Sequence, residues 1–446
     1  MKAKPGLHQL RKDLAGMRRS PNFPPVFVLN LYYSGMGIAR NLRGLGVPVY
    51  GLSSEDDAPG MTSRFFEKIY KVPNGRDEPN ALCHRLLEIC NEHDDAPVIF
   101  PTRDFDVLFL NEYRNELGGF YRLPENDAVS RILDKLELAN IAKKHDISVP
   151  VTVSCRTVDE IENAAQNLRF PVVIKPRFAY QWRIGKAWEL VGARKAILAQ
   201  SLDELMQEYH RIIAVNPEVL IQEYVSGKET DIVVCCCYIA RDGESFAHFT
   251  ARKLRQSPPM FGTGCAVEAV DIPEIVPLAA RLLRGCGYTG LAEVEFKHDK
   301  VADRFYLIEV NPRHWDQHEL GTLVGVNLTR MAYADMIGGT VSPQVPTYKG
   351  RACRWIAEPE ALMLLLRNAY AEVKCIRKQP HLRPAARLLA YGKALRTSVA
   401  ESIFLLRGHK VFATFNRRDP LPGFNLCIRA IRDMVGVLRT RELAKN

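Results

Sequence analysis

The 446-residue sequence lacks the features that mark membrane-spanning, secreted and disulfide-rich proteins. No apolar run reaches about 18 residues, so no segment is predicted to cross a bilayer. The first twenty residues, MKAKPGLHQLRKDLAGMRRS, have no apolar core of the kind that a signal peptide needs. The cysteines are eleven, an odd number, and form no CxxC pair, which disfavours a disulfide or metal framework. These absences predict a cytoplasmic protein.

The motifs of two common enzyme classes are also incomplete. The turn Gly35-Met36-Gly37 follows a predicted strand, but Arg40 stands where the third glycine of a dinucleotide-binding GxGxxG motif belongs. A tight strand-to-helix turn with some capacity for anions is the favoured interpretation. No Ser-His-Asp or Cys-His arrangement occurs in a recognisable local context, so a covalent nucleophile is not expected.

Positive charge is concentrated near the C-terminus. The net charge is +10, and residues 361–446 hold 17 Lys and Arg against 5 Asp and Glu, so the rest of the chain is slightly acidic. A basic tail can contact nucleic acid, an anionic lipid surface or an acidic protein, or can be a solvated helical face. Aromatic residues are not interleaved with these charges as single-strand binding favours, so nucleic acid is not expected.

Sequence patterns divide the chain into four segments. Residues 1–21 form a basic N-terminal segment, and residues 22–125 alternate strands and helices as an open parallel α/β domain does. Residues 126–342 have an α+β pattern that opens with a predicted helix over 130–150. Residues 343–446 are basic, with apolar residues at helical spacing, and are predicted to be mostly helical. These helices either pack on the core or lie on an anionic membrane surface.

Two predicted strands carry acidic side chains at alternate positions. LAEVEF and FYLIEV are separated by the polar stretch KHDKVADR and are expected to pair as an antiparallel hairpin. Side chains at every second position share one face of a strand, so Glu295, Glu309 and Asn311 are expected to converge. Oxygen ligands of this kind suit a hard cation such as Mg²⁺, which completes its shell with water and phosphate oxygens. The pattern therefore indicates a nucleoside triphosphate. A triplet of cysteines, Cys235 to Cys237, is expected to be core.

The order of motifs resembles that of a known superfamily. Lys135, VIKP with Lys175, QEYVSGKE, EVEF and IEVNPR follow one another as in the ATP-grasp superfamily, of the carboxylate–amine ligase type. The resemblance covers about residues 126–342. The segment before it, with its Gly turn and the stretch IFPTRD, looks like the pre-ATP-grasp domain. The implied fold is an ATP-grasp domain of two subdomains behind an open parallel α/β domain.

The resemblance implies roles for individual residues. Lys175 and, more weakly, Lys135 bind the phosphates, and Glu229 holds the ribose hydroxyls. The hinge that offers backbone groups to adenine is formed by Glu223, Tyr224 and Val225. Metal ligands are implied at Glu295, Glu309 and Asn311.

Basic residues supply the candidates for catalysis. Arg313 lies two residues after Asn311, where a guanidinium can clamp a phosphate or carboxylate. In RKLRQSPPMFGTG, Arg252, Lys253 and Arg255 form a second basic group, of which Arg255 is the chosen candidate; a solvent-facing loop is the alternative. Asp316 and His318 are candidates for the second substrate, unless His314 and His318 simply mark a helix surface. The bulky stretch 177–188 is a plausible flap over the phosphates.

Together these features predict an ATP-dependent carboxylate–amine ligase. It would form an amide bond through an acyl phosphate and release ADP and phosphate, with Mg²⁺, or Mn²⁺ as an alternative, as the metal. A phosphotransferase on the same fold and a non-catalytic ATP-binding regulator are the other hypotheses. The expected partners are a small-molecule carboxylate and an amine, and both a membrane surface and a homodimer stay open.

Overall fold

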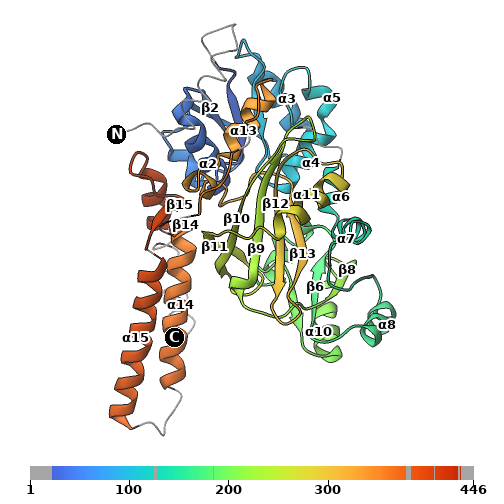
Figure 1. Cartoon of the computed structure of the whole chain (residues 1–446), viewed down its shortest axis with the longest axis vertical. Coiled ribbons are helices and arrows are strands. Elements are labelled where there is room, and N and C mark those ends of the chain that lie inside the picture. Colours follow the sequence, from blue (N-terminus) through green and yellow to red (C-terminus); the bar gives the residue numbers. More distant parts are fainter. Residues whose placement is uncertain are drawn as a thin grey trace, which may run out of the picture.

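The computed structural model describes residues 23–124, 128–183, 185–342, 344–348, 350, 352–377, 383–405, 407–429 and 432. The basic segment 1–21 therefore lies outside the described residues. Three β-sheets, of four, seven and four strands, organise the chain (Figure 1). Most of the helices before residue 342 pack on the faces of these sheets.

The first sheet is parallel throughout. Its strands lie in the order β3(Lys68–Lys71), β2(Val49–Ser53), β1(Val26–Leu29) and β4(Val98–Phe100). Val26 and Val28 of β1 pack with α2(Tyr33–Leu42), whereas Phe27 and Leu29 pack on the other side. That other side is covered by α3(Pro79–Cys90), α4(Asp104–Glu112) and α5(Arg114–Leu117). The prediction of an open parallel α/β unit is confirmed.

The second sheet is small and antiparallel. Its order is β5(Thr152–Cys155), β8(Val219–Glu223), β6(Val172–Pro176) and β7(Ile197–Ala199). One face packs against α8(Val158–Asn167), α10(Leu202–Ile212) and the Trp182 side chain. The short α9(Gly185–Leu190) lies between β6 and β7 in the sequence.

The large third sheet carries the predicted hairpin. Its order is β13(Arg304–Asn311), β12(Gly290–Asp299), β9(Ile232–Ile239), β10(Phe246–Ser257), β11(Thr263–Ala269), β14(Cys353–Ile356) and β15(His409–Phe412). β12 and β13 pair antiparallel as the sequence predicts. β14 pairs with β11, and β15 runs parallel to β14. The region after residue 342 therefore adds two strands to the large sheet besides its helices.

Both faces of the large sheet are buried. Cys235 and Cys237 point into one core, with α6(Val129–Leu133), α7(Lys135–Lys144) and α11(Ile275–Gly285). Cys236 points into the other, with α12(Leu320–Leu323), α13(Leu328–Met336) and the first sheet. The cysteine triplet is core, as predicted, and all eleven cysteines are free thiols.

The single helix expected over 130–150 is instead two, α6 and α7. Asp134 separates them with an extended backbone, and its carboxylate accepts hydrogen bonds from the amides of Leu136 and Glu137. An aspartate in this position caps a helix, so the helix starts afresh. Arg177, just after β6, also pairs with Asp134 at 2.6 Å. The break places Lys135 at the first turn of α7, next to the end of β6.

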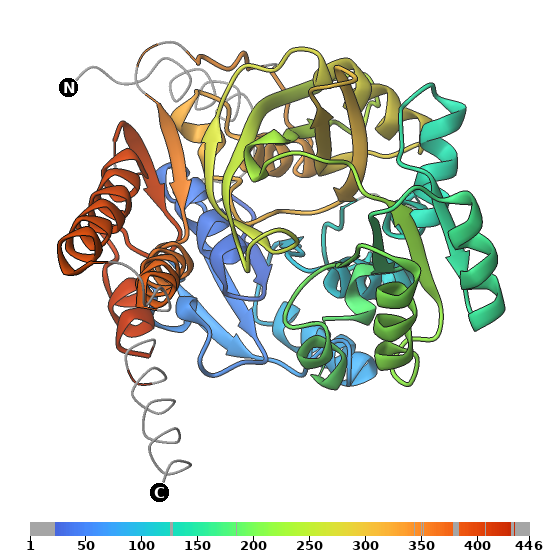
Figure 2. The same cartoon turned by 90° about the horizontal axis from the view of Figure 1, so that it is seen from below.

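Two long helices lie beyond β14. α14(Glu358–Arg377) and α15(Pro384–Leu405) run side by side and lead back to β15. Figure 2 views them end on, at the opposite side of the molecule from α8 and α10. Residues 421–429 form a further helix. Short 3-10 helices occur at Arg43–Leu45, Pro59–Thr62, Ala179–Gln181 and Glu229–Asp231.

Candidate active site

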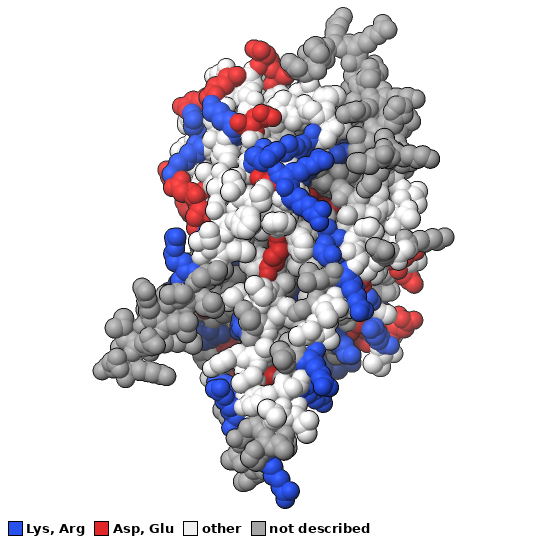
Figure 3. All heavy atoms as spheres, turned by 90° about the vertical axis from the view of Figure 1, so that its left-hand side faces the viewer, with Lys and Arg blue, Asp and Glu red and all other residues white. Residues whose placement is uncertain are grey.

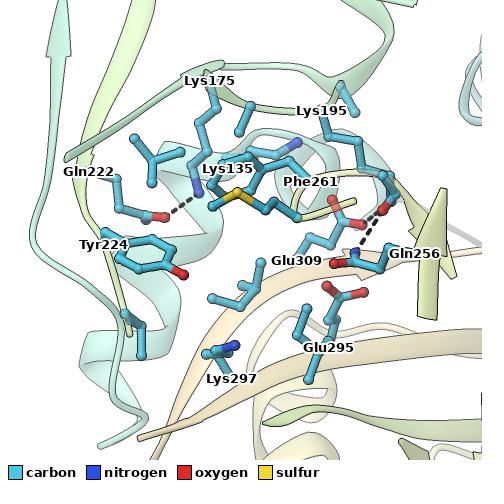
Figure 4. A pocket seen from close by; sticks show the side chains of 18 of the residues that line it. Lys135, Lys175, Lys195, Gln222, Tyr224, Gln256, Phe261, Glu295, Lys297 and Glu309 are labelled. Atoms are coloured by element: carbon cyan, nitrogen blue, oxygen red, sulfur yellow. Dashed lines mark hydrogen bonds and ion pairs between the residues drawn. The ribbon is translucent and has the colours of Figure 1, made fainter. Parts of the chain in front are cut away.

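A cavity of about 160 Å³ opens between the small antiparallel sheet and the large sheet. Figure 4 shows the side chains that converge on it from both sheets. It brings together eight of the residues singled out from the sequence: Lys135, Lys175, Glu223, Tyr224, Val225, Glu229, Glu295 and Glu309. The lysines Lys135 and Lys175 thus lie on one wall, and the paired carboxylates Glu295 and Glu309 lie on the other.

Lys175 is a buried ammonium at the end of β6. It donates a hydrogen bond of 2.8 Å to the Gln222 Oε1 (Figure 4). Gln222 in turn donates through Nε2 to the Thr152 hydroxyl at 2.6 Å. Burial and, to a smaller extent, the charge of the nearby Lys135 together lower the pKa of Lys175 to about 7. A buried cation whose only direct partner among the described residues is a neutral amide is poised to pair with an incoming anion.

Glu295 and Glu309 face each other across β12 and β13. Each carboxylate has its own lysine: Lys195 lies 2.9 Å from Glu309, and Lys253 forms a buried ion pair with Glu295. Burial favours the neutral acid at Glu309, but Lys195 and Lys135 outweigh it and hold the pKa of Glu309 well below its usual range. Both carboxylates are therefore held close to cations.

Asn311 lies beside a third buried acid. Its Nδ2 donates to Glu293 at 2.9 Å, and its Oδ1 accepts from Arg313 at 3.2 Å. Burial raises the pKa of Glu293 to about 7. Within the part of the chain that the structure describes, no three Asp, Glu, His or Cys side chains converge as a metal site.

In the hinge after β8, two backbone amides already form hydrogen bonds within the protein. The Glu223 amide donates to Val151 and the Tyr224 amide to Pro171, while the Glu223 carboxylate pairs with Arg169 at 3.0 Å. Glu229 accepts hydrogen bonds from the amides of Met260 at 3.1 Å and Gln256 at 3.3 Å. Its carboxylate thereby ties the turn after β8 to the end of β10 and to the loop that follows β10.

A second, polar cavity adjoins the first. Arg183, Lys195 and Glu295 line both, so the two cavities share a wall. The second cavity also reaches the first domain, and its further lining includes Asn30, Ser34, Thr102, Arg103, Lys253, Glu293, Asn311, Arg313 and Asp316. Arg313 lies in this cavity, 2.6 Å from Asp104 at the start of α4.

Comparisons with known proteins agree with this architecture. No family model matches the chain. The chain is 22% identical to a D-aspartate ligase of Enterococcus faecium over 75% of its length and 82% of that protein. It is 21% identical to a D-alanine–D-alanine ligase of Stutzerimonas stutzeri over 62% of its length and 78% of that protein.

The fold is shared with a solved structure that contains a nucleotide. The biotin carboxylase domain of a 2-oxoglutarate carboxylase from Hydrogenobacter thermophilus, in complex with MgADP and bicarbonate, superposes with a TM-score of 0.57. It has 17% sequence identity and covers 72% of this chain and 70% of its own. The chain therefore shares the ATP-grasp fold and is similar in sequence to carboxylate–amine ligases, as the order of its motifs predicted.

Arg255 lies outside both cavities of this ATP-grasp fold. Strict alternation would put Lys253 and Arg255 on one face of β10, but the pairing of β10 with β11 has a bulge between them. Lys253 points to Glu295, whereas the Arg255 guanidinium hydrogen-bonds the Leu254 carbonyl at 2.9 Å. A bulge inserts one residue and redirects the side chains that follow, so Lys253 takes the position expected of Arg255.

His314 and His318 are interior residues. They do not lie on a helix surface, and they line neither of the two cavities. They are 1% and 3% exposed, and burial lowers the pKa of His318 to about 4. His318 contacts the Ser34 carbonyl at 3.0 Å. Asp316 does line the second cavity, where its carboxylate accepts a hydrogen bond of 2.8 Å from Ser34.

The stretch 177–188 contributes to both cavities. Trp182 is buried and donates through Nε1 to Asn216 at 2.9 Å, which anchors the segment to the small sheet. Arg183, next along the chain, lines both cavities and lies 4.0 Å from Asp104. The anchor and the cationic side chain are thus adjacent residues.

Sequence reasoning missed two lysines of the ATP-grasp site. Lys297 lines the first cavity, and alternation along β12 from Glu295 could have identified it. Lys195 follows α9 in a stretch without any motif, and no local signal marks it. Its contact with Glu309 depends on the path of the loop between α9 and β7, which is seen only in the folded structure.

Proposed function

We propose that this ATP-grasp ligase joins a carboxylate to an amine with ATP and Mg²⁺, Mn²⁺ being able to replace Mg²⁺. The carboxylate takes the γ-phosphoryl group and becomes an acyl phosphate as ADP is formed. The amine then attacks the acyl carbon, and the C–N bond replaces the bond to phosphate, which leaves. Both substrates are small molecules. We assign the reaction to the cytoplasm, where ATP is abundant and the eleven thiols stay reduced.

The observation that carries this proposal is the wall shared by the two cavities. A nucleotide in the first cavity would direct its terminal phosphate to Arg183, Lys195 and Glu295, which also border the second. An acceptor carboxylate in the second cavity would then lie next to the phosphoryl group. Positioning and charge neutralisation supply most of the catalysis in phosphoryl transfer, and cations at this wall provide both.

The nucleotide roles follow from the first cavity. We assign the phosphates to Lys175, which is buried, and to the half-buried Lys135; both line this cavity. Adenine would lie at the hinge, near Val225 and the Tyr224 ring, because the amides of Glu223 and Tyr224 already bond to the fold. We keep Glu229 as the ribose ligand, on condition that it releases the loop amides it now accepts from.

The metal would be held by Glu295, Glu309 and Asn311. The fit rests on the donor set: two paired carboxylates, of which Glu309 keeps a strongly lowered pKa despite burial. A bound Mg²⁺ would neutralise charge on the phosphate oxygens. The two lysines that face these carboxylates, Lys195 and Lys253, stabilise the anionic forms that a cation requires. Lys195 is the more exposed of the two and can turn toward a phosphate.

The second cavity suggests an amino-acid-like substrate. Arg313 and Lys253 could hold a carboxylate, and Asp316, fixed by Ser34, could hold an ammonium group. We propose Lys253 in place of Arg255 as the cation that faces the acyl phosphate, with Arg313 as its partner. Cations outnumber acids along this lining, in keeping with an acidic ligand.

ADP release by the purified protein tests the proposal. Mg²⁺ and ATP are supplied with pooled carboxylates and pooled amines, separately and together, and product masses are measured. We expect ADP only when both are present, with a new mass equal to their sum less water. Release with an alcohol alone, and a phosphorylated mass, would instead identify a kinase. ATP binding without turnover in any pool would favour the regulator.

A further inference from the structure

The hairpin of α14 and α15 projects away from the two cavities (Figure 1). It is attached at its base, where Arg354 of β14 stacks on the Phe404 ring at 4.2 Å and pairs with Glu268 of β11 at 2.8 Å. The two helices contact the large sheet only near this base. Over most of their length they pack on each other. The outer faces of the hairpin are therefore surface.

The outer face of α14 combines apolar and basic side chains. Its exposed residues at spacings of three, four and seven are Leu362, Met363, Arg367, Tyr370, Lys374 and Arg377. Residues at these spacings share one side of a helix. Glu372, two residues from Tyr370, lies on the opposite side. Among the side chains described on this face of α14, none is acidic.

α15 repeats the pattern. Leu388 and Leu389 are 73% and 76% exposed, and Val399 and Ile403 continue the same side with Arg396 among them. The helix over residues 421–429 adds exposed Leu421, Phe424 and Ile428. Most of the large apolar side chains that are exposed in the described part of the chain lie in these three helices. Contiguous exposed apolar surface usually marks a binding surface.

The positive charge of this region indicates which kind of partner its exposed helical faces would bind. Residues 361–446 hold 17 Lys and Arg against 5 Asp and Glu. Figure 3 looks on to this side of the molecule, where Lys and Arg run down the face and Asp and Glu lie mainly toward its upper part. A second copy of the chain would oppose like charges here, which disfavours a homodimer. Basic residues are also spread among the apolar ones instead of forming a rim around an apolar centre, as protein interfaces have.

We propose that α14, α15 and the helix over residues 421–429 form a docking surface for an anionic lipid bilayer. No described helix is long and apolar enough to cross a membrane, so these helices lie in the interface. Leu388, Leu389 and Tyr370 enter the boundary between head groups and acyl chains. Arg367, Lys374 and Arg396 contact anionic head groups, and their apolar stems add to the buried surface. The base of the hairpin would then hold the two cavities at a fixed distance from the bilayer.

Vesicle co-sedimentation of the full-length protein tests the proposal. The vesicles contain phosphatidylcholine alone or mixed with phosphatidylglycerol, each at low and high salt. We expect binding to the anionic vesicles about tenfold stronger than to the neutral ones, and weaker at high salt. Leu388→Ser with Leu389→Ser, and separately Arg367→Glu with Arg396→Glu, should each weaken binding about tenfold.

Matched controls separate this surface from general stickiness. Val301→Ser removes a side chain that is 95% exposed in the turn between β12 and β13, and Lys143→Glu with Lys144→Glu reverses two exposed charges of α7. All variants should keep the unfolding temperature of the wild type. Failure to bind anionic vesicles at low salt would overturn the proposal, as would equal loss in the control variants. A dimer in analytical ultracentrifugation that Leu388→Ser with Leu389→Ser dissociates, without vesicle binding, would make this face a contact between copies.

Discussion

The Lys195 ammonium lies 2.9 Å from a Glu309 carboxylate oxygen, although the two residues are 114 positions apart. Lys195 comes from the loop before β7, and Glu309 from β13 of the large sheet. The pair therefore bridges the two parts of the fold between which the first cavity opens. Glu309, a carboxylate that we assign to the metal, is thus already paired with a lysine. Substitution of the carboxylate and substitution of the lysine should therefore have different effects.

Replacing Glu309 by Gln should abolish turnover and reduce ATP affinity only moderately. The amide keeps the shape but loses the charge that a divalent cation requires. ADP release and titration calorimetry with Mg²⁺ and ATP measure the two effects. Glu92→Gln, at an exposed carboxylate, is the control. Unchanged turnover in Glu309→Gln would remove the metal assignment.

Lys253→Met should destabilise the protein more than Lys195→Met. Lys253 and Glu295 are both buried, and breaking a buried ion pair costs about 3 kcal/mol because the remaining carboxylate loses its partner. Lys195 is partly exposed, so its loss should cost about 1 kcal/mol or less. Urea unfolding compares the two variants. Equal losses of stability would show that the Lys253 pair is not shielded from water.

ATP affinity should fall as the pH rises above about 7. Burial lowers the pKa of Lys175 to about 7, so at higher pH the free protein must take up a proton before Lys175 can pair with phosphate. Calorimetry between pH 6 and pH 9, in buffers of different ionisation enthalpy, should detect this proton uptake. A proton count that stays at zero across that range would exclude Lys175 as the titrating group.

The same pKa predicts the effect of Lys175→Met on stability. A lysine with a lowered pKa in the folded state carries a penalty that is fully present below about pH 7 and is relieved as the pH rises toward 10.5. Lys175→Met should therefore raise the unfolding temperature of the free protein near pH 6 and lose this advantage near pH 10. A lower unfolding temperature at pH 6 would mean that the Gln222 hydrogen bond outweighs the buried charge.

Asp316→Asn should raise the KM for one substrate without changing the KM for ATP. Asp316 lines the second cavity only, and Ser34 can still donate to the amide oxygen of the variant. Loss of an ion pair with an ammonium group should raise the KM about tenfold or more. An equal rise in the KM for ATP would point to a general disturbance of the site.

Arg40→Met should release the segment after β15. The Arg40 side chain is buried, pairs with Glu319 at 3.1 Å and donates to the carbonyls of Phe412, Ala413 and Thr414. Its removal leaves several acceptors and a buried carboxylate unpaired, at a cost of about 3 kcal/mol. Limited proteolysis should cut this segment faster, and Arg43→Met, in the 3-10 helix after α2, serves as the comparison.

Local rules sufficed for much of the candidate site. Alternation along β12 and β13 predicted that Glu295 and Glu309 face each other, because side chains of a strand point to one face at every second residue. The strand VVIKP delivered Lys175 to the cavity for the same reason. The split of the cysteine triplet between two cores also follows from this period alone.

Local rules failed where a single residue changed the geometry. The bulge in β10 separates Arg255 from the face of Lys253, so that Lys253 lines the second cavity and Arg255, the residue chosen from the sequence, does not. Asp134 divided a continuous helical pattern because its carboxylate caps a new helix and binds Arg177. Neither event alters the hydrophobic pattern by which strands and helices are predicted.

The sequence by itself determined the ATP-grasp order of motifs, the acidic hairpin of β12 and β13, and the basic tail, because each is recognised from residues close together along the chain. Only the tertiary structure decided that Lys195 meets Glu309, that Ser34 and Asp316 share a second cavity, and that β14 and β15 extend the large sheet. These contacts join segments between 114 and 282 residues apart or depend on strand order. Contacts of that kind are selected by the packing of whole layers, which no local period encodes.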